Sequence, residues 1–213
     1  MKLQLALDRL TIQEAIRITR LAEDYVDWIE VGTSLIKEFG MNSVKQLKEA
    51  FPQKIIVADC KTIDNARYEF EMCFEAGADV ATVMGVSPLV TLDACFDAAG
   101  KMNKSVMIDL LNTSAEQKAN LMKYQDGIFC HHTSRDELEE GAIINQRPQL
   151  AESSAVTIAA AGGITPDSLP ALMRNLNPAV AIIGSAITKA EDPAAAARQF
   201  KRIIESMEGN GNE

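Results

Sequence analysis

Aromatic side chains and positive charge are both scarce in this chain of 213 residues. Only 5% of the residues are aromatic while 47% are hydrophobic, so we expect a sizeable core of aliphatic side chains and alanine. Acidic residues outnumber basic ones by 30 to 21, and the net charge of −9 argues against nucleic acid or an anionic membrane surface as a partner. No apolar run approaches the length of a membrane span, and the N-terminal segment is too short and too polar to resemble a signal peptide.

Closely spaced cysteines are missing as well, because none of the four follows another at the C-x-x-C spacing. Each lies in an apolar stretch: Cys60, Cys73, Cys95 and Cys130. We therefore expect reduced core residues of a cytoplasmic protein, and neither a disulfide framework nor a zinc site.

Short apolar runs typical of strands alternate with longer helical patterns along the whole chain. The expected strands span residues 2–8, 27–31, 54–61, 79–84, 105–110, 127–132, 155–162 and 179–184. The expected helices span residues 12–24, 43–51, 65–76, 89–101, 115–124, 138–144, 166–174 and 193–207. Eight such units predict an α/β fold, a (β/α)8 or TIM barrel in a single domain over residues 1–207, with a frayed tail at 208–213. A doubly wound open sheet is the alternative.

The segment DCKTID at residues 59–64 directly follows the apolar run at 55–58. Because strand side chains alternate between faces, Asp59 and Lys61 project to one side and Cys60 to the other. A buried strand that ends on a carboxylate and an ammonium loses solvation energy, and a fold rarely needs such a pair for stability alone. Taken alone, the pair is equally compatible with an exposed strand end.

In a TIM barrel, catalytic side chains come from inward-facing positions at the carboxyl ends of the strands. Strand alternation places six ionisable residues around one such cavity: Asp8, Glu30, Asp59, Lys61, Asp109 and His132. Six of them at one mouth are hard to explain without chemistry. His131 has the opposite parity and is expected to be structural.

The carboxylates of this ring repel one another, and a bound divalent cation would relieve that repulsion. Oxygen ligands in small number suit Mg²⁺, which takes its remaining ligands from water and substrate. Lys61 beside Asp59 stays protonated and can stabilise a developing oxyanion, while His132 can transfer a proton near neutral pH. The pattern favours enolate chemistry on a substrate that also contacts Asp8 and Glu30.

Two glycine sites fall at the ends of the last two expected strands. Gly162 and Gly163 form one, and Gly184 with Ser185 forms the other. Backbone amides at such positions can approach an anion, and the loops after strands seven and eight of TIM barrels often bind phosphate. One Gly-Gly pair serves any tight turn, but two sites on adjacent strands predict a phosphate-binding site.

These motifs resemble the orotidine 5'-monophosphate decarboxylase suprafamily over nearly the whole chain. The Asp-x-Lys-x-x-Asp pattern at Asp59, Lys61 and Asp64 is similar to the suprafamily signature. Orotidylate decarboxylases carry a lysine near the end of strand two, where this chain has Glu30. The resemblance is therefore to the branch of 3-hexulose-6-phosphate synthases and 3-keto-L-gulonate-6-phosphate decarboxylases.

Membership in that branch would imply that Glu30 and Asp59 bind Mg²⁺ and that the reaction passes through an enediolate of a phosphorylated pentulose or hexulose. It would also imply a homodimer in which Asp64 reaches into the neighbouring subunit's site. No nucleic acid or membrane partner is expected.

The two activities of the branch are harder to separate. Four positions resemble the synthases: Thr62, Asp109, Ala161 and Ser185. The segment HTSRD at 132–136 resembles the decarboxylases, and its Arg135 is expected to orient a water or a carboxylate. Cys60 is unusual for either activity. The synthase, which joins formaldehyde to ribulose 5-phosphate, is favoured; the alternatives are the decarboxylase and a non-catalytic sugar-phosphate-binding barrel.

Overall fold

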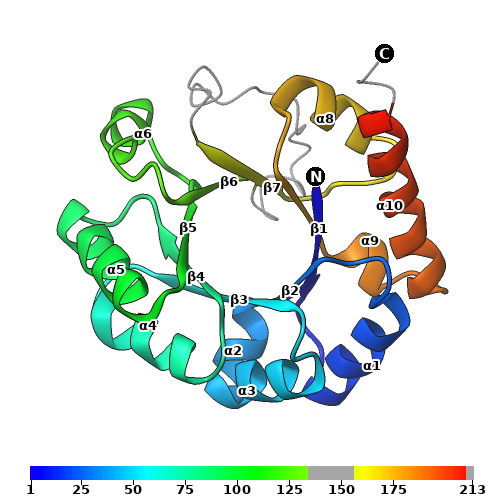
Figure 1. The fold of residues 1–213 in the computed structure, drawn as a ribbon, viewed down its shortest axis with the longest axis horizontal. Helices are drawn as coiled ribbons and strands as arrows, with labels where there is room; N and C mark the ends of the chain where they lie inside the picture. The colour runs from blue at the N-terminus through cyan, green and yellow to red at the C-terminus, as the bar shows by residue number, and fades with distance from the viewer. Residues whose placement is uncertain (134–155, 210–213) are drawn as a thin grey trace.

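The computed structural model describes residues 1–133 and 156–209, and the strands in these ranges close into a barrel (Figure 1). All of them are parallel, and each pairs with the next strand along the chain. Closure comes from pairing of the first strand with the last, where Lys2 lies opposite Val180. The predicted TIM barrel is confirmed, and the open-sheet alternative is wrong.

The strands are β1 (Lys2–Leu7), β2 (Trp28–Val31), β3 (Ile55–Thr62), β4 (Val80–Met84), β5 (Ser105–Asp109), β6 (Ile128–His132), β7 (Thr157–Ala161) and β8 (Val180–Ile183). The helices are α1 (Ile12–Ala22), α2 (Thr33–Phe39), α3 (Met41–Ala50), α4 (Ala66–Glu75), α5 (Leu89–Met102), α6 (Ala115–Leu121), α8 (Leu169–Leu176), α9 (Ser185–Thr188) and α10 (Pro193–Gly209). The strand bounds lie within two residues of the expected ones, because strands buried on both faces form continuous apolar runs.

The helices depart from expectation in bounds and in number: α6 ends three residues earlier and α8 begins three residues later than expected. Two helices, α2 and α3, separate β2 from β3, where the sequence predicted only the second. The short helix α9 follows β8 and was not predicted. Helix α10 continues to Gly209 rather than ending at 207, and Glu208 pairs there with the N-terminal ammonium of Met1. The helix expected at 138–144 lies outside the described residues.

The barrel has two separate apolar layers. Outside it, Leu3, Leu5 and Leu7 of β1 are fully buried against the helices. Inside it, an aliphatic cluster that includes Met107 and Ile182 fills the lower part. Because these side chains fill the barrel interior, a cavity is left only toward the carboxyl ends of the strands.

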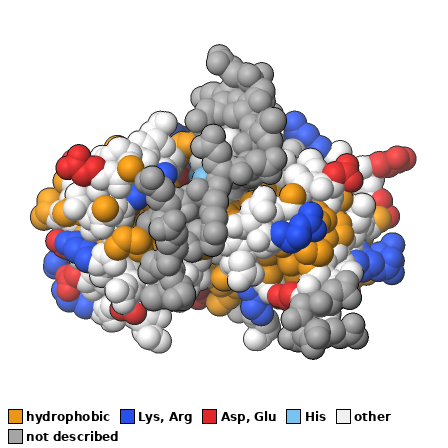
Figure 2. Space-filling model, turned by 90° about the horizontal axis from the view of Figure 1, so that it is seen from above, with side chains coloured by type: hydrophobic (Ala, Val, Ile, Leu, Met, Phe, Trp, Pro, Cys, Tyr) orange, Lys and Arg blue, Asp and Glu red, His pale blue; other side chains and the backbone are white. Residues whose placement is uncertain are grey.

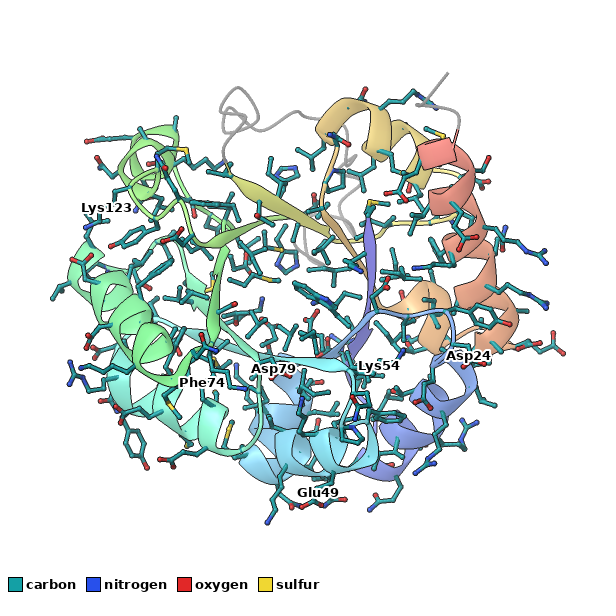
Figure 3. The ribbon with its side chains drawn as sticks, viewed as in Figure 1. Asp24, Glu49, Lys54, Phe74, Asp79 and Lys123 are labelled. Carbon is teal, nitrogen blue, oxygen red and sulfur yellow. The ribbon has the colours of Figure 1, made fainter. Side chains whose placement is uncertain are left out.

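At the opposite, amino-terminal end, two aspartates connect neighbouring strands in the same way. Asp27, just before β2, accepts the backbone N–H of Leu3 at 2.9 Å, and Asp79, just before β4, accepts that of Ile56 at 3.0 Å. Figure 3 shows Asp79 close to the sheet, whereas Asp24 and Glu49 lie at the periphery. These carboxylates hold the strands in register at the end of the barrel remote from the polar mouth.

The exterior is mixed in character. Basic, acidic and hydrophobic side chains are interspersed on the face shown in Figure 2. Within the described ranges, no helix is both long enough and apolar enough to span a membrane. All four cysteines are free thiols, and Cys73, Cys95 and Cys130 are buried.

Candidate active site

A cavity of about 700 Å³ opens at the carboxyl ends of the strands. Ten of the residues singled out in the sequence line it: Asp8, Glu30, Asp59, Lys61, Asp109, His132, Gly162, Gly163, Gly184 and Ser185. Five of them lie on β2, β3, β5 and β6, and Asp8 directly follows β1. The other four follow the ends of β7 and β8. The structure thus brings the predicted ionisable ring and both glycine sites to one place, while the role of each residue remains a prediction.

Asp109, at the end of β5, lies at the centre of the charged network. Its Oδ2 is 2.6 Å from Lys61 Nζ and 2.9 Å from His132 Nδ1, and its Oδ1 accepts the backbone N–H of Leu111 at 2.9 Å. Burial raises the pKa of the Asp109 carboxyl, but the hydrogen bond from His132 and the charge of Lys61 together hold that pKa well below its usual range. Asp109 is therefore an anion that can only accept hydrogen bonds.

An ionised Asp109 fixes the states of its two partners. Burial lowers the pKa of Lys61, but the charges of Asp59 and Asp109 outweigh burial and raise it above its usual range, so Lys61 is an ammonium. His132 must donate from Nδ1 to the carboxylate, and in the tautomer that this bond selects Nε2 is the nitrogen that can accept a proton. A cation and a base are thus positioned beside each other at the cavity.

Glu30 and Asp59 form a second, more negative part of the site. Glu30 is 8% exposed and accepts a hydrogen bond of 2.6 Å from Gln4 Nε2. Asp59 is 6% exposed and accepts from the hydroxyl groups of Thr33 at 2.7 Å and Thr82 at 2.9 Å. Burial and then the adjacent charge of Asp59 raise the pKa of Glu30 to about 8. Two adjacent carboxyl groups that resist being ionised at the same time form a site that a bound cation would stabilise.

The donor set is small. In residues 1–133 and 156–209 no group of three or more His, Cys, Asp or Glu side chains is arranged to hold a metal. Two carboxylates beside an open cavity suit Mg²⁺, which commonly keeps waters and takes other ligands from substrate.

Asp8 lies at the exposed rim of the cavity and is held from one side. Its Oδ1 accepts from the backbone N–H of Ser34 at 3.2 Å and from the Ser34 hydroxyl at 2.8 Å. Its carboxylate rests directly on Gly32, where an added Cβ would lie 2.4 Å from Asp8 Cγ. Glycine at position 32 therefore leaves the space in which Asp8 reaches the cavity.

The loops after β7 and β8 line the opposite side. Gly162 has φ 102°, and an added Cβ there would lie 2.2 Å from the carbonyl oxygen of Thr133. The chain passes this tight point to Gly163, while Gly184 leads directly into α9 at Ser185. These glycines allow main-chain atoms to line the cavity where side chains would otherwise fill it.

Two predicted site residues, Asp64 and Arg135, stand apart from this set for different reasons. Asp64 follows β3 on an exposed loop and is not among the described residues that line the cavity. Arg135 lies outside the described residues.

Several lining or supporting residues were missed in the sequence. Gln4 and Thr82 face the barrel interior, as the predicted ring does. Gln4 was passed over because Asp8 is the last polar inward residue at the end of the same strand. Thr82 was passed over because no residue of β4 was considered. Thr33 and Lys37 sit on α2, which the sequence did not predict as a helix. Gln4 and Thr82 would have been found if every polar residue at an inward-facing strand position had been counted, and not only the last one of each strand.

A TIM barrel whose mouth joins an ammonium, a carboxylate-bound histidine and a buried acidic pair defines an enzyme site rather than a structural one. The chain belongs to the orotidine 5'-phosphate decarboxylase / HUMPS family, whose model matches residues 1–200.

Relatives and solved structures narrow the comparison. A 3-hexulose-6-phosphate synthase of Bacillus subtilis (strain 168) is 36% identical over 211 residues, covering 96% of this chain and 99% of the relative. The crystal structure of a 3-hexulose-6-phosphate synthase from Salmonella typhimurium has a TM-score of 0.91 and 35% identity, covering 97% of this chain and 100% of that one. A 3-keto-L-gulonate-6-phosphate decarboxylase structure from Vibrio cholerae has a TM-score of 0.81 and 31% identity, covering 94% and 97%. The chain is thus an enzyme of the lyase type.

Proposed function

We propose that this protein is a Mg²⁺-dependent 3-hexulose-6-phosphate synthase, which joins formaldehyde to ribulose 5-phosphate. The observation that carries this proposal is the likeness to named synthases at about 35% identity over almost the full length of both chains. The arrangement of Lys61, Asp109 and His132 supplies the groups that the reaction needs.

Proton removal starts the proposed reaction. His132 Nε2 takes a proton from C1 of ribulose 5-phosphate, and Asp109 stabilises the imidazolium through Nδ1. The electron pair of the broken C–H bond moves onto the C2 carbonyl oxygen, giving an enediolate. Lys61 Nζ lies beside Asp109 and stabilises the negative oxygen.

Carbon–carbon bond formation follows. C1 of the enediolate attacks the carbon of formaldehyde, the C2 carbonyl reforms, and the formaldehyde oxygen takes the proton from His132. The base is regenerated and no oxidant or reductant is needed. Glu30 and Asp59 would hold Mg²⁺, which supplies Lewis-acid stabilisation of the substrate oxygens when bound.

Main-chain amides around Gly163, Gly184 and Ser185 are proposed to hold the substrate phosphate. This assignment is supported by their position in the loops after β7 and β8, which commonly bind phosphate in TIM barrels. Lys189 lines the same part of the cavity and adds a positive charge.

A decarboxylase of 3-keto-L-gulonate 6-phosphate is the second candidate, favoured by the Vibrio cholerae structure and by the segment HTSRD at 132–136. It would pass through an enediolate of the same kind, formed by loss of CO₂ rather than of a proton. The non-catalytic barrel is set aside because the chain is a lyase.

The purified protein with Mg²⁺ separates these candidates. We expect rapid consumption of formaldehyde with ribulose 5-phosphate and little CO₂ release from 3-keto-L-gulonate 6-phosphate, each compared with Lys61→Ala as an inactive control. Efficient CO₂ release with negligible formaldehyde consumption would replace the synthase by the decarboxylase.

A homodimer and a cytoplasmic location complete the proposal. Three apolar residues are exposed in the part of the chain that carries Asp64: Ile63 between β3 and α4, Tyr68 in α4 and Val90 in α5. Asp64 lies directly after Ile63. An apolar surface of this kind suits a second copy of the chain.

A further inference from the structure

Strand β3 is irregular at the point where it carries its catalytic side chains. Its pairing with β4 jumps from Ala58 opposite Ala81 to Thr62 opposite Val83. The three residues 59–61 therefore lie opposite the single residue Thr82. Such bulges bend a strand and re-aim its side chains, and they are common beside active sites.

The backbone at the end of this bulge is strained. Lys61 has φ 50°, in the left-handed region that is unfavourable for a residue other than glycine. The same residue places its Nζ 2.6 Å from Asp109 and 3.3 Å from Asp59. Something must hold Lys61 in this conformation, because the regular strand ladder is interrupted there.

Thr82 contacts all three residues of the bulge. Its Oγ1 accepts the backbone N–H of Lys61 at 2.9 Å and donates to Asp59 Oδ1 at 2.9 Å. Its backbone carbonyl accepts the thiol of Cys60 at 3.2 Å. One β4 residue thus satisfies groups that the irregular pairing leaves without their usual strand partners.

Burial makes these contacts hard to replace. Thr82 is 3% exposed, so removing its hydroxyl would leave a buried N–H and a buried carboxylate oxygen each short of a partner. The strand would then relax toward regular pairing, and Lys61 Nζ would move away from Asp109.

We propose that Thr82 is a positioning residue, whose hydroxyl holds the β3 bulge so that Asp59 and Lys61 face the substrate together. The catalytic part of this inference rests on the proposed function; the structural part does not. Thr82 acts through Asp59 and Lys61 and takes no part in bond formation itself.

Thr82→Val tests the catalytic part, because valine keeps the shape of threonine and removes the hydroxyl. We expect kcat to fall about 10- to 100-fold, with KM for the sugar phosphate within about twofold, because small displacements of reacting groups are costly while phosphate contacts are unchanged. Thr82→Ser, which restores a hydroxyl, should recover most of the loss.

Thr19→Val is the matched control. Thr19 is also fully buried and donates to the carbonyl of Ala15 at 2.8 Å, but it lies in α1 on the outside of the barrel. It should keep wild-type kcat. If Thr19→Val lost as much kcat as Thr82→Val, the effect would be one of general packing and the positioning role would be wrong.

Hydrogen exchange of the Lys61 amide, followed by NMR, tests the structural part without any activity. We expect exchange at least about tenfold faster in Thr82→Val than in wild type, and near wild-type exchange in Thr82→Ser and Thr19→Val. If Thr82→Val does not fold, Thr82→Ala removes the same hydroxyl with a smaller side chain. Both kcat and the exchange of the Lys61 amide are then measured on Thr82→Ala.

The two readouts separate the possible failures. A wild type that consumes no formaldehyde would refute the proposed function, while the amide exchange would still decide whether Thr82 holds the bulge. Unchanged protection of the Lys61 amide together with unchanged kcat in Thr82→Val would overturn the inference.

Discussion

A single oxygen, Asp109 Oδ2, receives hydrogen bonds from both Lys61 and His132. This arrangement links the group that would stabilise negative charge to the group that would remove the proton. Because Asp109 is almost fully buried and bonded through both oxygens, its two partners are held at fixed positions. Such preorganisation reduces the rearrangement needed when charge develops on the substrate.

Glu30→Gln tests the metal assignment at the scale of one residue. Glutamine keeps the size of the side chain and removes the negative charge, so we expect Mg²⁺ affinity to fall at least about tenfold, roughly 1.4 kcal/mol. Calorimetric titration of metal-stripped protein measures this loss directly. Glu49→Gln, on the exposed face of α3, is the matched control and should bind as wild type does. Equal affinities for all three proteins would remove Glu30 from the metal site.

Strand alternation predicted the inward set well because it depends only on the two-residue period of a strand. The structure places Lys61 in contact with both Asp59 and Asp109, although in β3 the bulge at 59–61, and not regular alternation, sets the direction of Lys61. The alternation could not indicate the left-handed backbone of Lys61 or its bond to Thr82, since both arise from pairing with another strand. The phosphate, metal and proton-transfer roles also remain predictions.

At the scale of elements, the strands were readable and the short helices were not. Helix α2 spans only seven residues and begins after Gly32, so it shows too little of the helical period to be recognised. It nevertheless carries Thr33 and Ser34, which bond to Asp59 and Asp8. By contrast, α1 and α6 begin with complete capping boxes at Thr11 and Ser114.

The amino-terminal end of the barrel gives a stability prediction. Burial raises the pKa of Asp79, but hydrogen bonds from Lys104 and Lys48, and from the N–H of Ile56, outweigh burial and lower it. A carboxyl group whose pKa is lowered on folding stabilises the fold above its unfolded pKa of about 3.9, and this contribution is lost as the pH falls through the folded pKa.

Asp79→Asn should therefore lower the melting temperature at pH 7, by an amount corresponding to about 1–3 kcal/mol, and the difference from wild type should shrink below about pH 4. Thermal unfolding followed by circular dichroism across this pH range measures both effects. Asp24→Asn, at an exposed peripheral position, should change little (Figure 3). A deficit in Asp79→Asn that stays constant down to pH 3 would contradict the charge-based explanation.

At the scale of the whole molecule, composition and alternation together predicted the closed barrel, because eight regular units leave few other ways to bury an aliphatic sheet. The oligomeric state could not be predicted in the same way, because the pattern of strands and helices in one chain does not show which surface contacts a second copy. The exposed position of Asp64 beside Ile63 and near Tyr68 is what a shared site would require.

Mixed dimers test that sharing. Lys61→Ala and Asp64→Asn should each be inactive as homodimers, but a hybrid dimer would contain one site with an intact Lys61 and the partner's intact Asp64. Co-expressed in equal amounts, the two variants should regain about one quarter of wild-type activity, since half of the dimers are hybrids and half of their sites are complete. Hybrids that form and remain inactive would place Asp64 in its own subunit's site or outside catalysis.

The central claim is that the site forms an enediolate with His132 as the base, and exchange of the C1 proton of ribulose 5-phosphate with solvent tests it most directly. With Mg²⁺ in D₂O and no formaldehyde present, proton NMR should show wild type replacing one C1 proton by deuterium, while His132→Asn leaves both protons in place. Retention of both protons by a wild type that consumes formaldehyde, or equal exchange by His132→Asn, would contradict the account.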